Sequence, residues 1–340
     1  MRLKKLFYLF TIMILLLGCW AYSLLHSLQM SSTFLSPAVS KKILVSKGAS
    51  SWEIASLLEK EGIVREGYSF LLLSLFTRHY NRLQAGEYLL SPIMDPLEVL
   101  KILREGRVVL YPFTVPEGVT LREVADLLER KGLARRENIL TLSRDQRFLT
   151  SLGVKADSLE GYIFPDTYLF PRDFGERRIL KVMVGVLNRV FTSERLWRAK
   201  EIGFTRHQVI TLASLIEKEA KEDEERPLVS MVYHNRLRKR MRLQCDPTII
   251  YAMGEAFRGD LTRQDLSFPS SYNTYLHVGL PPGSICNPGE ASLQAALYPA
   301  EGKFLYFVSQ NNGRHHFSVT LEEHNRMVRR YQPKGKPVAP

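Results

Sequence analysis

Two carboxylates stand one residue apart in Glu217-Lys218-Glu219, at the end of an apolar stretch that begins at Val209. At 100° per residue, Ile216 marks the centre of the apolar face. Glu219 lies about 60° from that centre, Glu217 lies about 100° from it, and Lys218 points away. A carboxyl partly removed from water has a raised pKa and can act as a general acid near neutral pH, which makes Glu219 the candidate. The alternative is a glutamate at the border of the buried face that pairs with an arginine, and by helical periodicity alone this alternative is the more common.

A second group of polar side chains lies in two later segments. The first contains Gln244 and Asp246, and its Asp-Pro-Thr sequence is typical of a turn that opens a helix, where Asp246 would act as the cap. The second contains Tyr272, Asn273 and Tyr275, followed by the loop 279–283. Aromatic faces and amides suit sugar rings and their hydroxyls, although the same composition is also typical of plain turns.

Metal and cofactor chemistry are not expected. The three histidines near the C-terminus lack the His-Glu-x-x-His spacing of a zinc site and are interpreted as ordinary polar residues; they are His315, His316 and His324. No Gly-x-Ser-x-Gly turn, phosphate-binding loop or dinucleotide fingerprint occurs. No Cys-x-x-Cys pair occurs either, and whether Cys245 and Cys286 form a disulfide stays open.

Amphipathic helices must position these residues. The patterns predict helices over residues 176–191, 205–220 and 225–238, and the last two flank the carboxylate pair. After residue 238 the chain is rich in Gly, Pro and Asn and is expected to form loops, interrupted by one strand at 304–308.

An internal repeat lies before this region. Residues 43–70 and 113–140 match at a constant offset of 70, and each copy predicts a strand, a glycine turn and an amphipathic helix. Ser50 with Glu53, and Thr120 with Glu123, have the spacing of capping boxes. Gly62 and Gly132 are expected to end the helices. A strand over 84–90 and a helix over 95–104 complete a small α+β module at 43–111, of the size and pattern of LysM-type wall-binding modules.

The N-terminus predicts the compartment. Basic residues at positions 2, 4 and 5 precede an uncharged run long enough to cross a bilayer, and the next charge is Lys41. This pattern predicts a cytoplasmic end at 1–5, a single-pass inner-membrane anchor at 6–28, a linker at 29–42 and an extracytoplasmic remainder. A cleaved signal peptide is the alternative, since residues 16–19 resemble a lipoprotein box, but the apolar run continues beyond Cys19.

Composition limits the partners. The 340 residues are 45% hydrophobic and 24% charged, which is typical of a globular protein of about two domains. Lys and Arg number 47 against 35 Asp and Glu, so the net charge is 47 − 35 = +12. Outside the membrane nucleic acid is a poor partner, whereas an anionic membrane surface or wall polymer fits; a solvated basic surface is the plain alternative.

A series of motifs resembles the YceG-like family of endolytic murein transglycosylases. In chain order, they are LEGYIFPDT (159–167), ASLIEKEA (213–220), NRL (235–237), MRLQCDPTIIYAMG (241–254), YNTY (272–275), GLPPG (279–283), NPG (287–289) and LYFV (305–308). Their order and spacing fit over about residues 40–330. Cys245 departs from the family, whose members usually have Ser or Thr beside the Asp-Pro, so a role for that side chain is in doubt.

The resemblance implies an α+β protein in three parts. These are a transmembrane helix, a LysM-like module at 43–111 and a mixed α/β catalytic domain at 112–332. The composition of residues 333–340 separately predicts a disordered tail. The resemblance also implies cleavage of nascent peptidoglycan glycan strands between N-acetylmuramic acid (MurNAc) and N-acetylglucosamine (GlcNAc), with 1,6-anhydro ends, and a role beside peptidoglycan synthases in ending elongation. The family's catalytic residue, the second glutamate of Glu-Lys-Glu, falls on Glu219. Substrate contacts are expected at Asp246, Gln244, Tyr272, Asn273, Tyr275 and Glu217.

Two other functions fit parts of the sequence. A wall-binding scaffold without activity would need only the module and the basic charge. A muramidase would use water as the nucleophile and a second carboxylate, for which Glu217 and Asp246 are the candidates.

Overall fold

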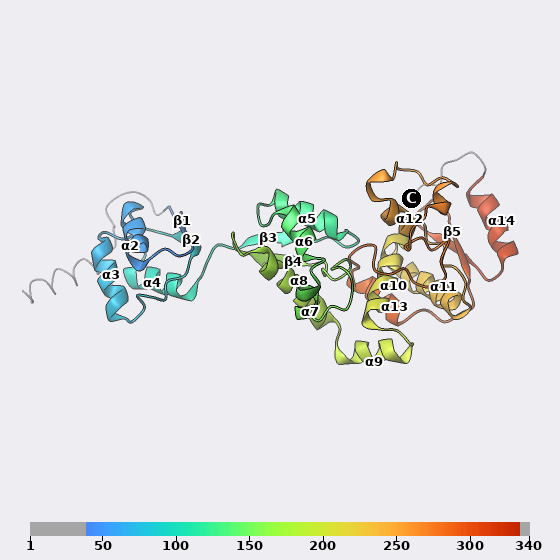
Figure 1. The fold of residues 1–340 in the computed structure, drawn as a ribbon, viewed down its shortest axis with the longest axis horizontal. Coiled ribbons are helices and arrows are strands. Elements are labelled where there is room, and N and C mark those ends of the chain that lie inside the picture. The colour runs from blue at the N-terminus through green and yellow to red at the C-terminus, as the bar shows by residue number, and fades with distance from the viewer. Residues whose placement is uncertain (1–38, 334–340) are drawn as a thin grey trace, which may run out of the picture. The chain divides into compact units, whose positions relative to one another are not determined.

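The computed structural model describes residues 39–333, which form a mixed α+β protein with three two-stranded sheets, β1-β2, β3-β4 and β5-β6 (Figure 1). The chain divides into two compact units. Of the described residues, unit 1 contains 39–111 together with Leu169–Asp173, and unit 2 contains Pro112–Tyr168 and 174–333. The predicted anchor at 6–28, most of the linker and the tail beyond residue 333 lie outside the described residues. Between residues 39 and 333, no helix has both the length and the apolar character needed to cross a membrane.

Unit 1 is a small α+β module. Its elements are β1 (Lys41–Val45), α2 (Ser51–Lys60), α3 (Gly67–Phe76), β2 (Gly86–Leu90) and α4 (Pro96–Glu105). The strands are antiparallel, with Lys41 opposite Leu90 and Val45 opposite Gly86. Their inward side chains form one core with the apolar faces of the helices. The late segment 169–173 is tied to this unit by Lys47, whose Nζ donates to the carbonyl of Asp173 at 2.8 Å.

The first part of unit 2 repeats the beginning of unit 1. Its elements are β3 (Tyr111–Thr114), α5 (Leu121–Arg130), α6 (Arg136–Leu142), α7 (Gln146–Ser151), β4 (Thr167–Phe170), α8 (Glu176–Val190) and α9 (Ser193–Glu201). The first residue of β3 and the last two residues of β4 are assigned to unit 1. Helices α2 and α5 begin and end 70 residues apart, and β1 and β3 begin 70 residues apart. The predicted repeat is therefore confirmed as a repeated strand and helix.

The predicted ends of the repeated helices are also confirmed. Ser50 with Glu53 forms a capping box on α2, and Thr120 with Glu123 forms one on α5. Gly62 and Gly132 follow the helix ends with φ of 69° and 66°, a left-handed conformation that glycine adopts at little cost.

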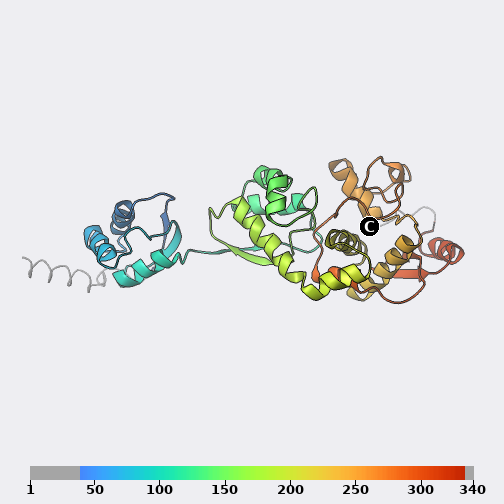
Figure 2. The same cartoon turned by 60° about the horizontal axis from the view of Figure 1, so that its bottom comes forward.

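The second part of unit 2 contains the carboxylate pair. Its elements are α10 (Arg206–Glu219), α11 (Arg226–Arg238), α12 (Asp246–Met253), α13 (Glu290–Leu297), β5 (Tyr306–Ser309), β6 (His315–Ser318) and α14 (Leu321–Tyr331), with short 3-10 turns at Asp223–Glu225, Gly254–Ala256 and Asp265–Ser267. Helix α10 packs against α11, α12 and α13, which lie around it in both views (Figures 1 and 2). Strands β5 and β6 form an antiparallel hairpin.

The expectation of loops after residue 238 was wrong for three segments, which form α12, α13 and α14. Only α14 has a strong amphipathic pattern and a side-chain cap, from Thr320. Helix α13 has glycine at its N-cap position and no side-chain cap from its own segment; the backbone N–H of Gly289 donates to Glu217 of α10 instead. Such a helix is stabilised by tertiary contacts, which local sequence does not reveal.

Candidate active site

Glu219 is the last residue of α10, and the helix brings it from the core of unit 2 to a partly exposed position. Thr205 caps the start of the helix in a capping box with Gln208. All eight residues from Val209 to Ile216 are buried, so neighbouring elements enclose the helix on every side and close packing fixes its orientation. The chain turns to an extended conformation at Ala220, which leaves Glu219 at the helix end.

Two side chains form hydrogen bonds with the Glu219 carboxyl, and the charge of a third, Asp246, lies nearby. The Tyr233 hydroxyl donates to Glu219 Oε1 at 3.2 Å, and the Cys245 thiol is also hydrogen-bonded to the carboxyl. Both neighbours are fully buried. Burial, together with the nearby charge of Asp246, raises the pKa of Glu219 to about 7, although the two hydrogen bonds lower it. Glu219 can therefore hold a proton at neutral pH and release it.

Asp246 lies beside this carboxyl at the first position of α12. Its side chain does not cap the helix; the N-cap residue is Cys245, and the expectation of a cap by Asp246 was wrong. Asp246 Oδ1 instead accepts a hydrogen bond of 2.5 Å from the Tyr275 hydroxyl. Burial raises the pKa of Asp246, and the Tyr275 bond opposes that rise.

Arg236 fixes the backbone that leads to Asp246. Its Nη1 donates to the carbonyl of Leu243 at 2.8 Å and to Gln244 Oε1 at 3.3 Å, and its Nε donates to the carbonyl of Leu305 at 2.6 Å. Gln244 is exposed with φ of 50°, a left-handed conformation that is uncommon outside glycine. The guanidinium therefore holds an irregular loop in one shape directly before Cys245 and Asp246.

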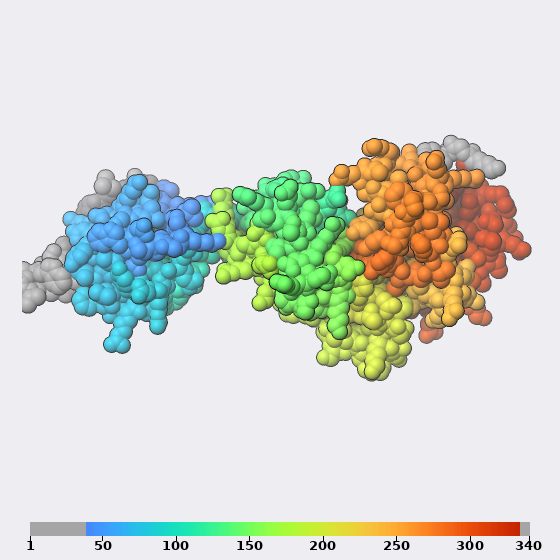
Figure 3. Space-filling view, in the orientation of Figure 1, coloured from blue at the N-terminus to red at the C-terminus, as the bar shows by residue number. Residues whose placement is uncertain are grey.

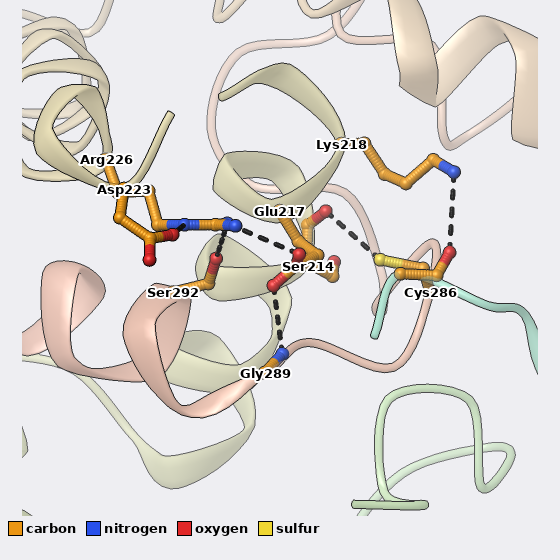
Figure 4. Close-up of polar contacts among 9 residues, drawn as sticks. Ser214, Glu217, Lys218, Asp223, Arg226, Cys286, Gly289 and Ser292 are labelled. Carbon is orange, nitrogen blue, oxygen red and sulfur yellow. Dashed lines mark hydrogen bonds and ion pairs between the residues drawn. The ribbon is translucent and has the colours of Figure 1, made fainter. Parts of the chain in front are cut away.

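Glu217 does not share this site. Its Oε1 lies 3.3 Å from Arg226 Nη1, with 6% of the Glu217 side chain and 8% of the Arg226 side chain exposed. Its Oε2 accepts from the backbone N–H of Gly289 at 2.9 Å (Figure 4). Glu217 therefore joins α10 to α11 through a buried ion pair and to the start of α13 through a hydrogen bond. Pairing with an arginine is the alternative role that the sequence pattern allowed for a glutamate of this motif.

The two tyrosines and the asparagine of the 272–275 segment have different surroundings. Tyr275 reaches Asp246, whereas the ring of Tyr272 packs against Tyr251 with centroids 5.1 Å apart. Asn273 is fully buried, and its amide nitrogen donates to the carbonyls of Leu266 and Phe268. The Asn273 side chain thus holds its own loop together. Tyr272 and Tyr275, both partly exposed, remain the sugar-contact candidates of this segment.

Known proteins resemble this chain over most of its length. A profile of the YceG-like family matches residues 43–330. The chain belongs to the YceG-like family. The resemblance found in the sequence motifs is therefore confirmed.

Three relatives support this assignment. An endolytic murein transglycosylase of Bacillus subtilis (strain 168) is 32% identical over 305 residues, which cover 85% of this chain and 84% of the relative. An endolytic murein transglycosylase of Streptococcus pneumoniae (strain D39) is 29% identical over 84% of this chain, which spans 57% of that relative's length. The crystal structure of a YceG-like protein from Listeria monocytogenes matches with a TM-score of 0.59 and 33% identity, covering 85% of this chain and 99% of that one.

The YceG-like chain contains a second buried carboxyl that the sequence arguments did not single out. Glu160, 7% exposed, accepts from the backbone N–H of Leu121 at 2.8 Å and from the Tyr251 hydroxyl at 3.2 Å. Burial raises the pKa of Glu160 to about 7. It joins the start of α5 to α12, and Tyr251 in turn packs on Tyr272. Its place in the LEGYIFPDT motif was the available signal, but no helical periodicity pointed to burial there.

Two cysteines and two of the C-terminal histidines contact neighbouring protein groups. Cys245 and Cys286 are both buried thiols, and they form no disulfide with each other. Cys286 Sγ lies 3.4 Å from the carbonyl of Ser214 (Figure 4). His315 Nδ1 lies 2.7 Å from Glu225 Oε2, and the ring of His324 stacks on Tyr306.

Proposed function

We propose that this chain is an endolytic murein transglycosylase that cleaves peptidoglycan glycan strands internally, at the β-1,4 bond from MurNAc to GlcNAc. It leaves 1,6-anhydro-MurNAc ends. The observation that carries the proposal is one partly buried carboxyl, Glu219, with a pKa of about 7 at the end of a rigid helix. Relatives from Bacillus subtilis and Streptococcus pneumoniae carry the name endolytic murein transglycosylase.

One carboxyl can perform both proton transfers of this reaction. Protonated Glu219 gives its proton to the glycosidic oxygen as the bond from C1 of MurNAc breaks and the GlcNAc hydroxyl leaves. The Glu219 carboxylate then takes the proton from the C6 hydroxyl of the same MurNAc, whose oxygen bonds to C1. No water is consumed, and Glu219 ends in its starting protonation state.

The neighbours adjust this carboxyl. The Tyr233 hydrogen bond orients Glu219 Oε1 and stabilises the carboxylate formed after the first step. The negative charge of Asp246 favours the protonated form that starts the reaction and would stabilise positive charge at C1. Tyr275 holds the Asp246 carboxyl through its hydroxyl.

The proposal includes a place at the outer face of the cytoplasmic membrane. A single-pass anchor at 6–28 would hold the enzyme there, and unit 1 would bind glycan as a LysM-like module. Unit 1 has the antiparallel strand pair and two intervening helices of a small α+β module, which is consistent with that assignment. Nascent strands would be cut near peptidoglycan synthases, which ends their elongation.

A muramidase is the second candidate, because Asp246 lies close enough to Glu219 to raise its pKa. In a muramidase this carboxylate would act as the base or nucleophile, and water would be consumed.

The deciding experiment incubates the full-length protein in detergent with uncross-linked glycan strands and analyses the product ends by mass spectrometry. We expect ends lighter by one water than reducing ends. Glu219→Gln should lower the rate at least about a thousandfold, because glutamine cannot donate the proton. Glu222→Gln, an exposed glutamate three residues further on, should cleave normally. Reducing ends would establish the muramidase, and cleavage by Glu219→Gln at the normal rate would exclude Glu219 as the acid. Strands bound but never cut would indicate the scaffold.

A further inference from the structure

Four cations gather in one short segment beside the candidate active site. This basic segment, residues 238–242, contains Arg238, Lys239, Arg240 and Arg242, and all four are exposed. None of them forms an ion pair with a carboxylate anywhere in residues 39–333. Only Arg238 has a side-chain partner, the neutral amide oxygen of Asn235. The segment therefore presents positive charge that nothing within the described chain neutralises.

The basic segment is connected directly to the reactive carboxyls. Arg242 forms an antiparallel bridge with Val278, and the backbone N–H of Gln244 donates to the carbonyl of Thr274 at 3.1 Å. These two contacts, together with the hydrogen bond from Tyr275 to Asp246, join residues 242–246 to residues 274–278. Arg242 stands four positions before Asp246, so their Cα atoms are at most about 14 Å apart, and the left-handed conformation of Gln244 shortens this span.

The shape of this loop is fixed. Arg240 has φ of 53° and Gln244 has φ of 50°, both in the left-handed region that costs free energy for residues with a side chain. Arg236 holds the carbonyls of Arg242 and Leu243, at 3.2 and 2.8 Å. The four cations therefore lie on a loop whose backbone is held in one conformation. Figure 3 shows that α12 and the loops after it, drawn in orange, form exposed surface of unit 2.

We propose that the basic segment binds the free carboxylates of the peptide stems on the glycan strand. This inference rests on the proposed function and names the part of the substrate that the site recognises besides sugar. A stem is attached at C3 of each MurNAc, close to the C1 that is cleaved, so every internal cut brings a stem to the site. About four extended stem residues span up to roughly 14 Å, which is long enough to reach from Asp246 to Arg242. Guanidinium groups bind carboxylates through paired charge-assisted hydrogen bonds. A lipid diphosphate is a weaker fit, because it occurs only at the strand end and an endolytic cut lies away from it.

The test compares strands that carry stems with strands from which an amidase has removed them. The full-length variant Lys239→Glu/Arg242→Glu reverses two exposed charges. It spares Arg238, because its partner Asn235 also donates a hydrogen bond to the carbonyl of Phe304, just before β5. The matched control is Arg130→Glu/Lys131→Glu, which reverses two exposed charges at the far end of α5. On strands with stems we expect the basic-segment variant to raise KM about tenfold or more with kcat nearly unchanged, and the control to match the unaltered protein. On stripped strands all three proteins should have equal kcat/KM.

Two results would overturn the inference. One is an equal loss on stripped strands, which would mean a contact with sugar or a damaged site. The other is a loss confined to strands that retain a lipid-linked end, which would assign the segment to the diphosphate. If the unaltered protein cuts neither kind of strand, the proposed function fails; if it cuts both and the basic-segment variant behaves like the control, only the stem inference fails.

Discussion

The protonation state of Glu219 decides at which pH the enzyme works. With a pKa of about 7, Glu219 is mostly protonated below neutrality and mostly ionised above it. Since the first step needs the proton, we expect kcat to fall about tenfold per pH unit above pH 7.

Tyr233 allows this assignment to be tested. Its hydrogen bond stabilises the Glu219 carboxylate and lowers the pKa, so Tyr233→Phe should move the alkaline limb of the kcat profile to higher pH. The loss of one hydrogen bond should lower kcat at the optimum by no more than about tenfold. Tyr162→Phe is the control, because that hydroxyl contacts His207 instead, and its limb should not move. An unmoved limb in Tyr233→Phe would mean that another group sets the profile.

At the scale of elements, α10 gives its two glutamates separate tasks. Glu219 faces the reactive neighbours, while Glu217 holds the start of α13 through Gly289 and pairs with Arg226. Removing one partner of a buried pair leaves the other charge uncompensated. We therefore expect Glu217→Gln to lower the free energy of unfolding of unit 2 by about 3 kcal/mol.

Urea unfolding and the pH profile together check this prediction. Glu217→Gln should keep its alkaline limb near pH 7, and the exposed Glu222→Gln should change stability by no more than about 0.5 kcal/mol. If Glu217→Gln abolished cleavage and left stability intact, Glu217 would belong to the chemistry.

Ionisation of Glu160, which joins α5 to α12, makes the stability of the folded protein depend on pH. Its pKa of about 7 lies above the value of 4.5 that it has in the unfolded chain, so between these values the folded protein binds more protons than the unfolded one. Stability is then highest below pH 4.5, as far as this group is concerned, and falls as the pH rises toward 7. The total change is up to about 3 kcal/mol.

Thermal unfolding of Glu160→Gln would measure this effect. The variant should lose less stability between pH 5 and pH 8 than the unaltered protein, because glutamine does not ionise. An identical pH dependence in both proteins would show that Glu160 is not the group responsible.

Local patterns predicted the elements that position Glu219 but not its surroundings. The helix predicted over 205–220 is α10, and the one over 225–238 is α11. Helix α10 has a capping box and α11 has proline in its first turn, and both contain apolar residues at helical spacing. Tyr233, Cys245 and Tyr275 meet at the site from three separate segments, and no periodicity relates their positions. The buried pairing of Glu217 with Arg226 depends on how α10 and α11 pack, so no local pattern identified Arg226 as the partner.

At the scale of the whole molecule, the repeat places equivalent residues in two separate cores. Leu58 of α2 and Leu128 of α5 stand 70 residues apart, and both are fully buried. Each Leu→Ala substitution should destabilise its own unit by about 2–5 kcal/mol. Hydrogen exchange should show the loss of protection confined to unit 1 for Leu58→Ala and to unit 2 for Leu128→Ala. Loss spread over both units in either variant would mean that they unfold together.

The segment Leu169–Asp173 belongs to unit 1 although most of the chain around it belongs to unit 2. The polypeptide therefore passes between the units at 111/112, at 168/169 and again at 173/174. A gene rearrangement that replaced only the first 111 residues would leave five residues of the old module behind in the catalytic unit. Replacing the whole of unit 1 would therefore also require replacing residues 169–173, which lie within the sequence of unit 2. We expect the two units to have evolved together rather than to have been exchanged separately.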